Sequence, residues 1–280
     1  MGDLDDTDLI EREARDTDIA LHLAATGHIA SATAISQGLS KAQSKSPKHW
    51  IQMSGATLLA AEIAQSRFGF KAARTFDDLN DIQDVMSIIR SNPKRAVDNL
   101  VISQDSSKVK TALIVGPLIY GVGRGPVNTR SVQAPEIARV TLEQKEGFRL
   151  AEGENSWSNV HVHDLSGLIV ALVDAAVNNR PGLWNENGIY FPENGNMTFG
   201  KLCAEIAAEA HKHGLVPDPE VKKVIDGKEA DALSGHASIL WGTNAVLRSS
   251  RARTQLGWKP SAPSLKNVIP EIVRIETGRR

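Results

Sequence analysis

Short strand-forming runs alternate with longer helical patterns over the first 115 residues, and this alternation constrains the fold more than any other feature of the chain. Buried strands are expected at residues 19–24, 49–53 and 109–115. Helical spacing separates or precedes them at residues 31–45, 81–89 and 95–103. Strands that alternate with helices in this way predict a parallel sheet with helices on both faces.

The pattern changes in the second half of the chain. Glycines and a proline mark a loop at residues 121–126. Beyond it we expect a helix at 134–146, a strand at 159–162 and an apolar helix at 165–178 that Asp164 caps. We therefore predict two units, residues 1–125 and residues 126–280, with the second interleaved with the last strands of the core.

Composition excludes several classes of protein. The 280 residues are 41% hydrophobic and 23% charged, with a net charge of −1, so the chain is expected to be soluble and globular. No apolar run reaches about 18 residues, the acidic start is unlike a signal peptide, and no basic excess favours nucleic acid. The single cysteine, Cys203, is expected to be a buried small hydrophobe, which favours a reducing compartment and a cytoplasmic location.

Six segments, taken in order, resemble the extended short-chain dehydrogenase/reductase family, the NAD-dependent epimerase/dehydratase type. They are residues 2–6, 21–25, 51–57, 116–123, 159–165 and 256–260. The resemblance implies a doubly wound, Rossmann-like α/β fold with a smaller C-terminal α/β substrate part. It also implies an NAD(P)-binding oxidoreductase that acts on a small organic substrate.

The resemblance implies a cofactor, NAD or NADP, held by Asp3, Leu4, Leu23, Ala24, Ala25 and Pro117. The family's glycine-rich loop, GxxGxxG, whose backbone N–H groups hold the pyrophosphate, does not occur in this sequence. The first residues match the end of the family's third strand, so we expect a truncated fold that lacks two βαβ steps, on the order of 60 residues. Cofactor binding is expected to be impaired, and possession of no cofactor is the alternative.

The catalytic residues also depart from the family pattern. A tyrosine followed four residues later by a lysine is expected, because the lysine lowers the pKa of the phenol. Neither of the two tyrosines, Tyr120 and Tyr190, has that lysine, and the missing pair should fall near Lys94 and Asp98. We expect classical hydride transfer to be impaired. The remaining catalytic candidates are Tyr120, Ser54, Thr57, Lys94 and His161.

Four residues are expected to line a substrate cleft: Arg124, Arg130, Trp157 and Asn159. The two arginines could hold an anionic or carbonyl group, or they could be solvated loop residues. His161 and His163 stand two apart on the predicted strand and would face one side of the sheet. No third ligand stands at metal spacing, so no metal site is expected, and His22 is expected to be a hydrogen-bonded core residue.

Two alternatives to an oxidoreductase stay open. One is a cofactor-independent isomerase, cyclase or dehydratase that uses Tyr120, Lys94, Asp98 or His161. The other is a non-catalytic binding or regulatory protein, or an N-terminally incomplete gene product. In the truncated fold, whatever its function, the strand at 19–24 would lie at a sheet edge, where we expect a covering homodimer, the acidic N-terminal segment folded over it, or poor solubility.

Overall fold

The computed structural model describes residues 2–44, 46–61, 63 and 67–279. The helices are α1 Thr7–Asp16, α2 Ile29–Lys41, α4 Ile82–Ser91, α5 Ala96–Ile102, α6 Gln133–Gln144, α7 Val162–Val177, α8 Phe199–Lys212, α9 Gly227–Leu233, α10 Ala237–Gly242, α11 Ser250–Gln255 and α12 Leu265–Thr277, with 3-10 turns η1 Ala56–Leu59 and η2 Asn185–Asn187. The strands are β1 Ile19–His22, β2 Lys48–Gly55, β3 Phe76–Asp77, β4 Val109–Gly116, β5 Leu118–Tyr120, β6 Phe148–Leu150, β7 Ser156–His161, β8 Ile189–Tyr190, β9 Asn196–Thr198, β10 Lys223–Ile225 and β11 Leu247–Arg248.

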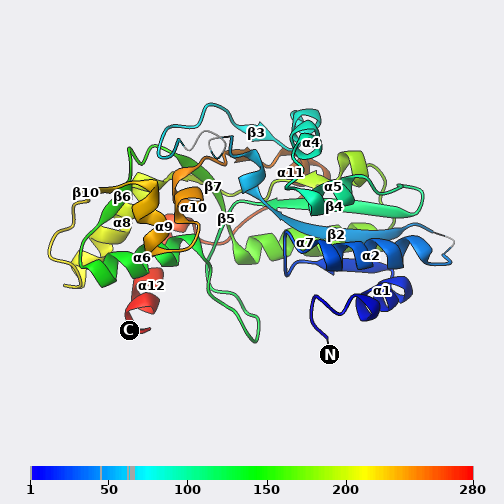
Figure 1. Ribbon diagram of the computed structural model, residues 1–280, viewed down its shortest axis with the longest axis horizontal. Coiled ribbons are helices and arrows are strands. Elements are labelled where there is room, and N and C mark those ends of the chain that lie inside the picture. Colours follow the sequence, from blue (N-terminus) through cyan, green and yellow to red (C-terminus); the bar gives the residue numbers. More distant parts are fainter. Residues whose placement is uncertain (1, 45, 62, 64–66, 280) are drawn as a thin grey trace.

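The main sheet is four-stranded and parallel, in the order β1-β2-β4-β8 (Figure 1). Successive side chains of a strand point to opposite faces. Trp50 and Leu113 accordingly join the hydrophobic cluster that contains residues of α2 and α5, whereas Ile51 and Ile114 join the cluster that contains residues of α7. The predicted parallel sheet with helices on both faces is confirmed.

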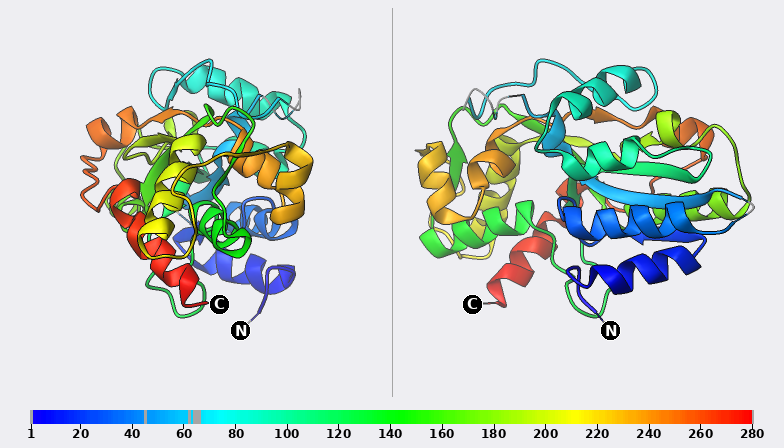
Figure 2. Two further views of the ribbon diagram at one scale, coloured as in Figure 1. Left: turned by 90° about the vertical axis from the view of Figure 1, so that its left-hand side faces the viewer. Right: turned by 45° about the vertical axis from the view of Figure 1, so that its right-hand side comes forward.

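Smaller sheets complete the molecule. One has the order β5-β7-β9, and two-stranded sheets pair β6 with β10 and β3 with β11. The sheet of β6 and β10 lies on the left of Figure 1 among helices α6, α8, α9, α10 and α12 (Figure 2), whereas β3 lies at the top beside α4. The halves are not independent, since β8 comes from the second half of the chain and completes the main sheet.

A buried carboxylate ties these halves together just after β3. Asp78 accepts hydrogen bonds from the backbone N–H groups of Phe191 at 3.0 Å and Arg251 at 2.8 Å. Burial is the largest influence on Asp78 and raises its pKa to about 6, against the effect of these two bonds. Three segments far apart in sequence therefore meet at one side chain.

The N-terminal helix α1 was not predicted from sequence. Its N-cap Asp6 accepts a hydrogen bond from the N–H of Leu9. It packs closely on α2 at Gly38, where an added Cβ would lie 2.3 Å from the carbonyl oxygen of Glu11. Strand β1 is at the edge of the sheet in the described part of the chain, as predicted, and Leu21 stays 48% exposed there.

Two predictions near residue 162 are wrong. Helix α7 begins at Val162, so His163 lies in its first turn and not on the strand with His161. The cap is His161, whose Nδ1 accepts from the N–H of His163 at 3.1 Å, and not Asp164. The Asp164 carboxylate instead accepts from the N–H groups of Ser261 at 2.9 Å and Ala262 at 3.2 Å, which anchors the chain before α12.

Other boundaries differ by a few residues. Strand β1 ends two residues before the predicted 24, and α2 covers 29–41 where 31–45 was expected. Cys203 is buried in α8, as predicted, and burial raises its thiol pKa to about 12. Among the described residues, none of the helices has the length and apolar character needed to cross a membrane.

Candidate active site

The carboxyl end of β2 meets the first turn of α5, and four polar side chains gather there. Ser54 is the second-last residue of β2, Thr57 lies in η1, Arg95 is the N-cap residue of α5, and Asp98 lies in its first turn. The guanidinium of Arg95 donates from Nη2 to Thr57 Oγ1 at 2.7 Å. Its Nη1 lies 3.8 Å from Asp98 Oδ2. The structure thus brings together Ser54, Thr57 and Asp98, and it adds Arg95.

Asp98 is the buried member of this group, with a relative exposure of 1%. Neither of its carboxylate oxygens has a hydrogen-bond partner among the residues that the structure describes. Burial raises the pKa of Asp98, while the nearby Ser54 hydroxyl, which is not aligned for a hydrogen bond, and the Arg95 charge oppose the rise. A buried carboxyl of this kind needs Arg95 as its compensating charge.

Arg95 and Thr57 are the accessible members of the group. The Arg95 side chain keeps 19% of its surface exposed, and Thr57 is half-buried. Burial lowers the pKa of Arg95 and Asp98 opposes this, so a guanidinium remains charged throughout the ordinary pH range. It can stabilise negative charge on an oxygen atom placed beside Thr57.

Lys94 takes no part in this cluster. It is exposed on the connection between α4 and α5, where its backbone N–H donates to Asn92 Oδ1 at 3.1 Å. The neighbouring Arg95 faces Thr57 instead. Sequence reasoning missed Arg95 because it searched for a tyrosine and a lysine at a fixed spacing.

Both tyrosine hydroxyls of the chain are bound to main-chain carbonyls. Tyr120 Oη donates to Pro263 O at 2.9 Å, and Tyr190 Oη donates to Leu183 O at 2.7 Å. Burial is the largest cause that raises the pKa of Tyr120 to about 12, and burial also raises the pKa of Tyr190. Neither phenol is placed to give its proton to a substrate.

His161 packs against Tyr120, beside Gly121 at the start of the loop at residues 121–126. The two rings are perpendicular, with centroids 5.3 Å apart, and His163 lies 4.6 Å from His161. Burial, followed by the charge of His163, lowers the pKa of His161, which is 6% exposed. Across the described ranges, no group of three His, Cys, Asp or Glu side chains is arranged to hold a metal ion.

Three of the four expected substrate-binding residues make hydrogen bonds within the protein, and the fourth, Arg124, is exposed. Arg130 is held by Glu276, to which Nε and Nη2 donate at 2.9 and 3.0 Å, and its Nη2 also lies 2.7 Å from Glu136. Arg124 is exposed on the loop that precedes α6. The indole of Trp157 donates to Thr243 O at 2.8 Å. Asn159 is buried beside Gly195, whose backbone oxygen accepts from the Asn159 N–H at 2.9 Å.

A chain of hydrogen bonds links the N-terminal turn to the centre of the sheet. Asp5 Oδ1 lies 3.1 Å from His28 Nε2, Ser31 Oγ lies 3.0 Å from His28 Nδ1, and the same Ser31 oxygen lies 3.1 Å from His22 Nε2. His22 Nδ1 then meets Gln52 Oε1 at 2.7 Å. Because the Gln52 amide nitrogen donates to two carbonyls, its oxygen accepts and His22 Nδ1 is the donor. The predicted hydrogen-bonded core role of His22 is confirmed.

These residues test the fit of an NAD-type cofactor. Five of the six expected cofactor contacts lie at the surface near the end of β1: the exposed Asp3, Leu23 and Ala24 and the half-buried Leu4 and Ala25. The sixth, the buried Pro117, follows β4. The two ends of a dinucleotide therefore have candidate contacts. A pyrophosphate needs free N–H groups at a helix N-terminus. The α2 N-terminus instead has the His28 ring as its cap, bonded to the N–H of Ser31, and the Asp5 carboxylate beside it. The α2 N-terminus therefore does not fit a pyrophosphate.

Comparison with known proteins identifies the family. The chain is 31% identical over 290 residues to the oxidase ucsJ of an Acremonium species, a match that covers 99% of this chain and 83% of the oxidase. The chain therefore belongs to the same family as this oxidase. No family model matches the sequence.

Solved structures show the fold class. A dTDP-glucose 4,6-dehydratase from Streptomyces venezuelae, solved with NAD, has a TM-score of 0.67 at 16% identity over 100% of this chain and 79% of its own. A UDP-glucose 4-epimerase from Thermotoga maritima, solved with UDP-glucose, has a TM-score of 0.57 at 15% identity over 99% and 84%. The fold is that of the NAD-dependent epimerases and dehydratases, as the sequence segments indicated.

Proposed function

We propose that the chain is an atypical epimerase/dehydratase-type enzyme that acts on a small organic substrate at the Thr57–Arg95 pair. The observation that carries the proposal is the 2.7 Å hydrogen bond from Arg95 to Thr57 at the carboxyl end of β2. In the resemblance, this end of the strand supplies the catalytic Ser or Thr. Asp98 is the positioning residue, since its buried carboxylate lies 3.8 Å from the guanidinium.

The pair would act by stabilising charge. A guanidinium has five N–H donors. One of them is used on Thr57, and within the described ranges the guanidinium makes no other hydrogen bond, so its donors on the accessible side can bind a substrate oxygen that becomes negative, as in an alkoxide or an enolate. The Thr57 hydroxyl accepts from Arg95 and can therefore direct its own proton toward the same oxygen. This replaces a role that the resemblance gives to a tyrosine, and both tyrosines here are bound elsewhere.

The proposed enzyme binds an NAD-type cofactor weakly or not at all. The solved dehydratase holds NAD, and the residues near the end of β1 together with Pro117 would supply contacts for the two ends of a dinucleotide. The occupied α2 N-terminus supports impaired NAD(P) binding, and the binding of both tyrosine hydroxyls to main-chain carbonyls supports impaired classical hydride transfer. The same two features favour the second candidate, a cofactor-independent isomerase, cyclase or dehydratase at the same pair. We further propose that the protein works in the cytosol and forms a homodimer that covers the edge strand β1, because Leu21 is exposed on this strand.

The first experiment separates these readings. A panel of small ketones, aldehydes and enolisable acids is offered twice: with NAD(P)H, following its absorbance, and without cofactor in D₂O, following deuterium incorporation by NMR. Arg95→Met should lower whichever activity is found by about 10²–10³-fold, the usual loss for an oxyanion-stabilising donor. Arg90→Met, at the exposed end of α4, is the matched control. Activity that survives Arg95→Met would refute the assignment, and inactivity in both assays would favour a non-catalytic binding protein.

Thermal unfolding tests the cofactor separately. NAD(H) or NADP(H) at 100 times its dissociation constant should add about 2.7 kcal/mol to the free energy of unfolding. We expect no shift of the midpoint at millimolar cofactor. A shift of several degrees would show that the dinucleotide ends suffice for binding.

A further inference from the structure

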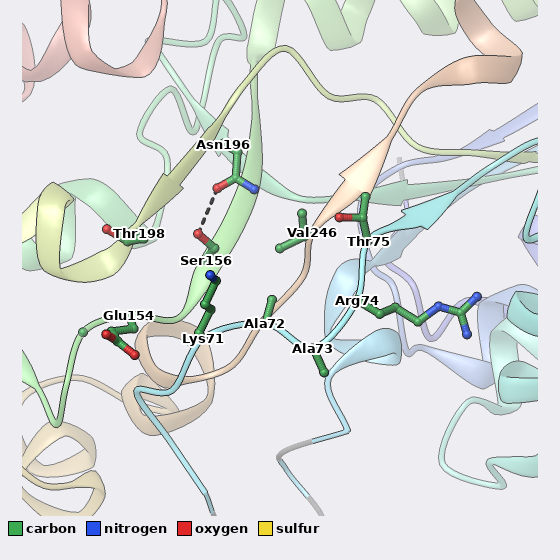
Figure 3. A pocket seen from close by; sticks show the side chains of 11 residues that line it. Lys71, Ala72, Ala73, Arg74, Thr75, Glu154, Ser156, Asn196, Thr198 and Val246 are labelled. Atoms are coloured by element: carbon green, nitrogen blue, oxygen red, sulfur yellow. Dashed lines mark hydrogen bonds between the residues drawn. The ribbon is translucent and has the colours of Figure 1, made fainter.

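A cavity lies away from the Thr57–Arg95 pair, on the part of the molecule built by β7 and β9. Its volume is about 580 Å³, within the usual range for small-molecule sites. The walls come from residues 71–75, the turn at 153–156, β9 and Val246 (Figure 3). Ser54, Thr57, Arg95 and Asp98 are not among its lining residues.

Hydrogen bonds hold the walls in place. The N–H of Glu154 donates to Gly69 O at 2.9 Å, and the side chain of Asn244 donates to Phe70 O at 2.9 Å. On the other side, the N–H of Phe76 donates to Val246 O at 2.9 Å. A site that is already formed loses little conformational entropy when a ligand binds.

The polar groups of the cavity differ in how far they are already paired. Ser156 Oγ donates to Asn196 Oδ1 at 2.9 Å, so the amide nitrogen of Asn196 is left facing Thr75 and Val246 (Figure 3). Arg74 points away from the cavity and binds Asp81 at 3.1 Å and Asp84 at 2.8 Å. Lys71 reaches toward Ser156, and within the described ranges its ammonium has no ion-pair partner (Figure 3).

We propose that this cavity binds a small carboxylate that also carries a hydroxyl or an amine. The free Lys71 ammonium and the Asn196 amide supply donors for the carboxylate. The exposed Glu154 carboxylate supplies an acceptor for the hydroxyl or amine. Ala72 and Val246 cover a short carbon chain.

Titration calorimetry on the full chain tests the proposal with L-malate and L-serine as probes. At least one should bind at millimolar concentration or tighter, and malate dimethyl ester, which has no charge, should not. Lys71→Met should weaken binding by about tenfold or more, the equivalent of one charge-assisted hydrogen bond. Glu154→Gln should weaken serine more than malate, because an ammonium gains more from a carboxylate than a hydroxyl does.

Lys228→Met is the matched control, because Lys228 is exposed and lies outside the cavity lining, and it should leave binding unchanged. Arg95→Met should also bind the probes normally, so failure of this site and failure of the proposed active site are distinguishable. The proposal is overturned if neither probe binds at tens of millimolar, if Lys71→Met binds as tightly as the wild type, or if inorganic phosphate binds more tightly than both carboxylates.

Discussion

Replacing Arg130 decides whether this arginine binds the substrate or stabilises the fold. The Glu276 side chain is only 3% exposed, and Arg130 is its one ion-pair partner among the described residues. Glu136 is different, since it keeps Arg139 at 2.9 Å when Arg130 is lost. Arg130→Met therefore leaves one buried carboxylate unpaired, which lowers the free energy of unfolding by about 3–5 kcal/mol.

The assay is thermal and urea unfolding of four proteins. At roughly 2–4 °C per kcal/mol, Arg130→Met should lower the midpoint by on the order of 6–20 °C. The double variant Arg130→Met/Glu276→Met should regain most of this loss, since no buried charge remains. Arg124→Met, on the same loop but exposed, should change stability by less than about 0.5 kcal/mol. A loss below about 1 kcal/mol for Arg130→Met would refute the structural role and favour a role of Arg130 in substrate binding.

Three further perturbations follow from single contacts. Burial raises the pKa of Asp78 to about 6 from an ordinary value of 3.8. The protonated carboxyl therefore stabilises the fold below pH about 4, and this stabilisation is lost as the pH rises through 6. In urea unfolding, the stability difference between wild type and Asp78→Asn should shrink by up to about 3 kcal/mol from pH 4 to 7. A constant difference would contradict that pKa. Gly38→Ala should destabilise by about 1–3 kcal/mol in thermal unfolding because its Cβ would overlap α1, whereas Gly167→Ala, in α7 with open space around it, should stabilise by up to about 1 kcal/mol. Tyr120→Phe should lose about 1 kcal/mol of stability by calorimetry and keep any activity found with the substrate panel; an inactive Tyr120→Phe protein would make the phenol catalytic.

The main sheet could be predicted because its strands are buried on both faces. Such strands are continuous apolar runs, as in β4, where the residues from Ala112 to Val115 have almost no exposed surface. Helix α1 escaped prediction because Ala14 is its one fully buried residue and most of the others are charged or polar. Strands of two residues, such as β3 and β11, are too short to show a period.

The candidate site was predictable only in part. Ser54, Thr57 and Asp98 were named from their place along the fold, and the structure brings them together. The hydrogen bond from Arg95 to Thr57 joins residues 38 apart in sequence, and it forms only because of the turn η1 and of the residue at which α5 begins. Local sequence patterns do not predict contacts between such distant residues. The same holds for Arg130 and Glu276, which are 146 residues apart.

The position of Asp78 has a consequence for how the chain is made. Its two backbone donors, at residues 191 and 251, are synthesised long after Asp78 itself. While the nascent chain emerges, the first half therefore has a main sheet without its last strand and an acidic group whose burial nothing yet offsets. Asp78 therefore stays solvated until residue 251 has emerged from the ribosome, and only then can this joint between the two halves form.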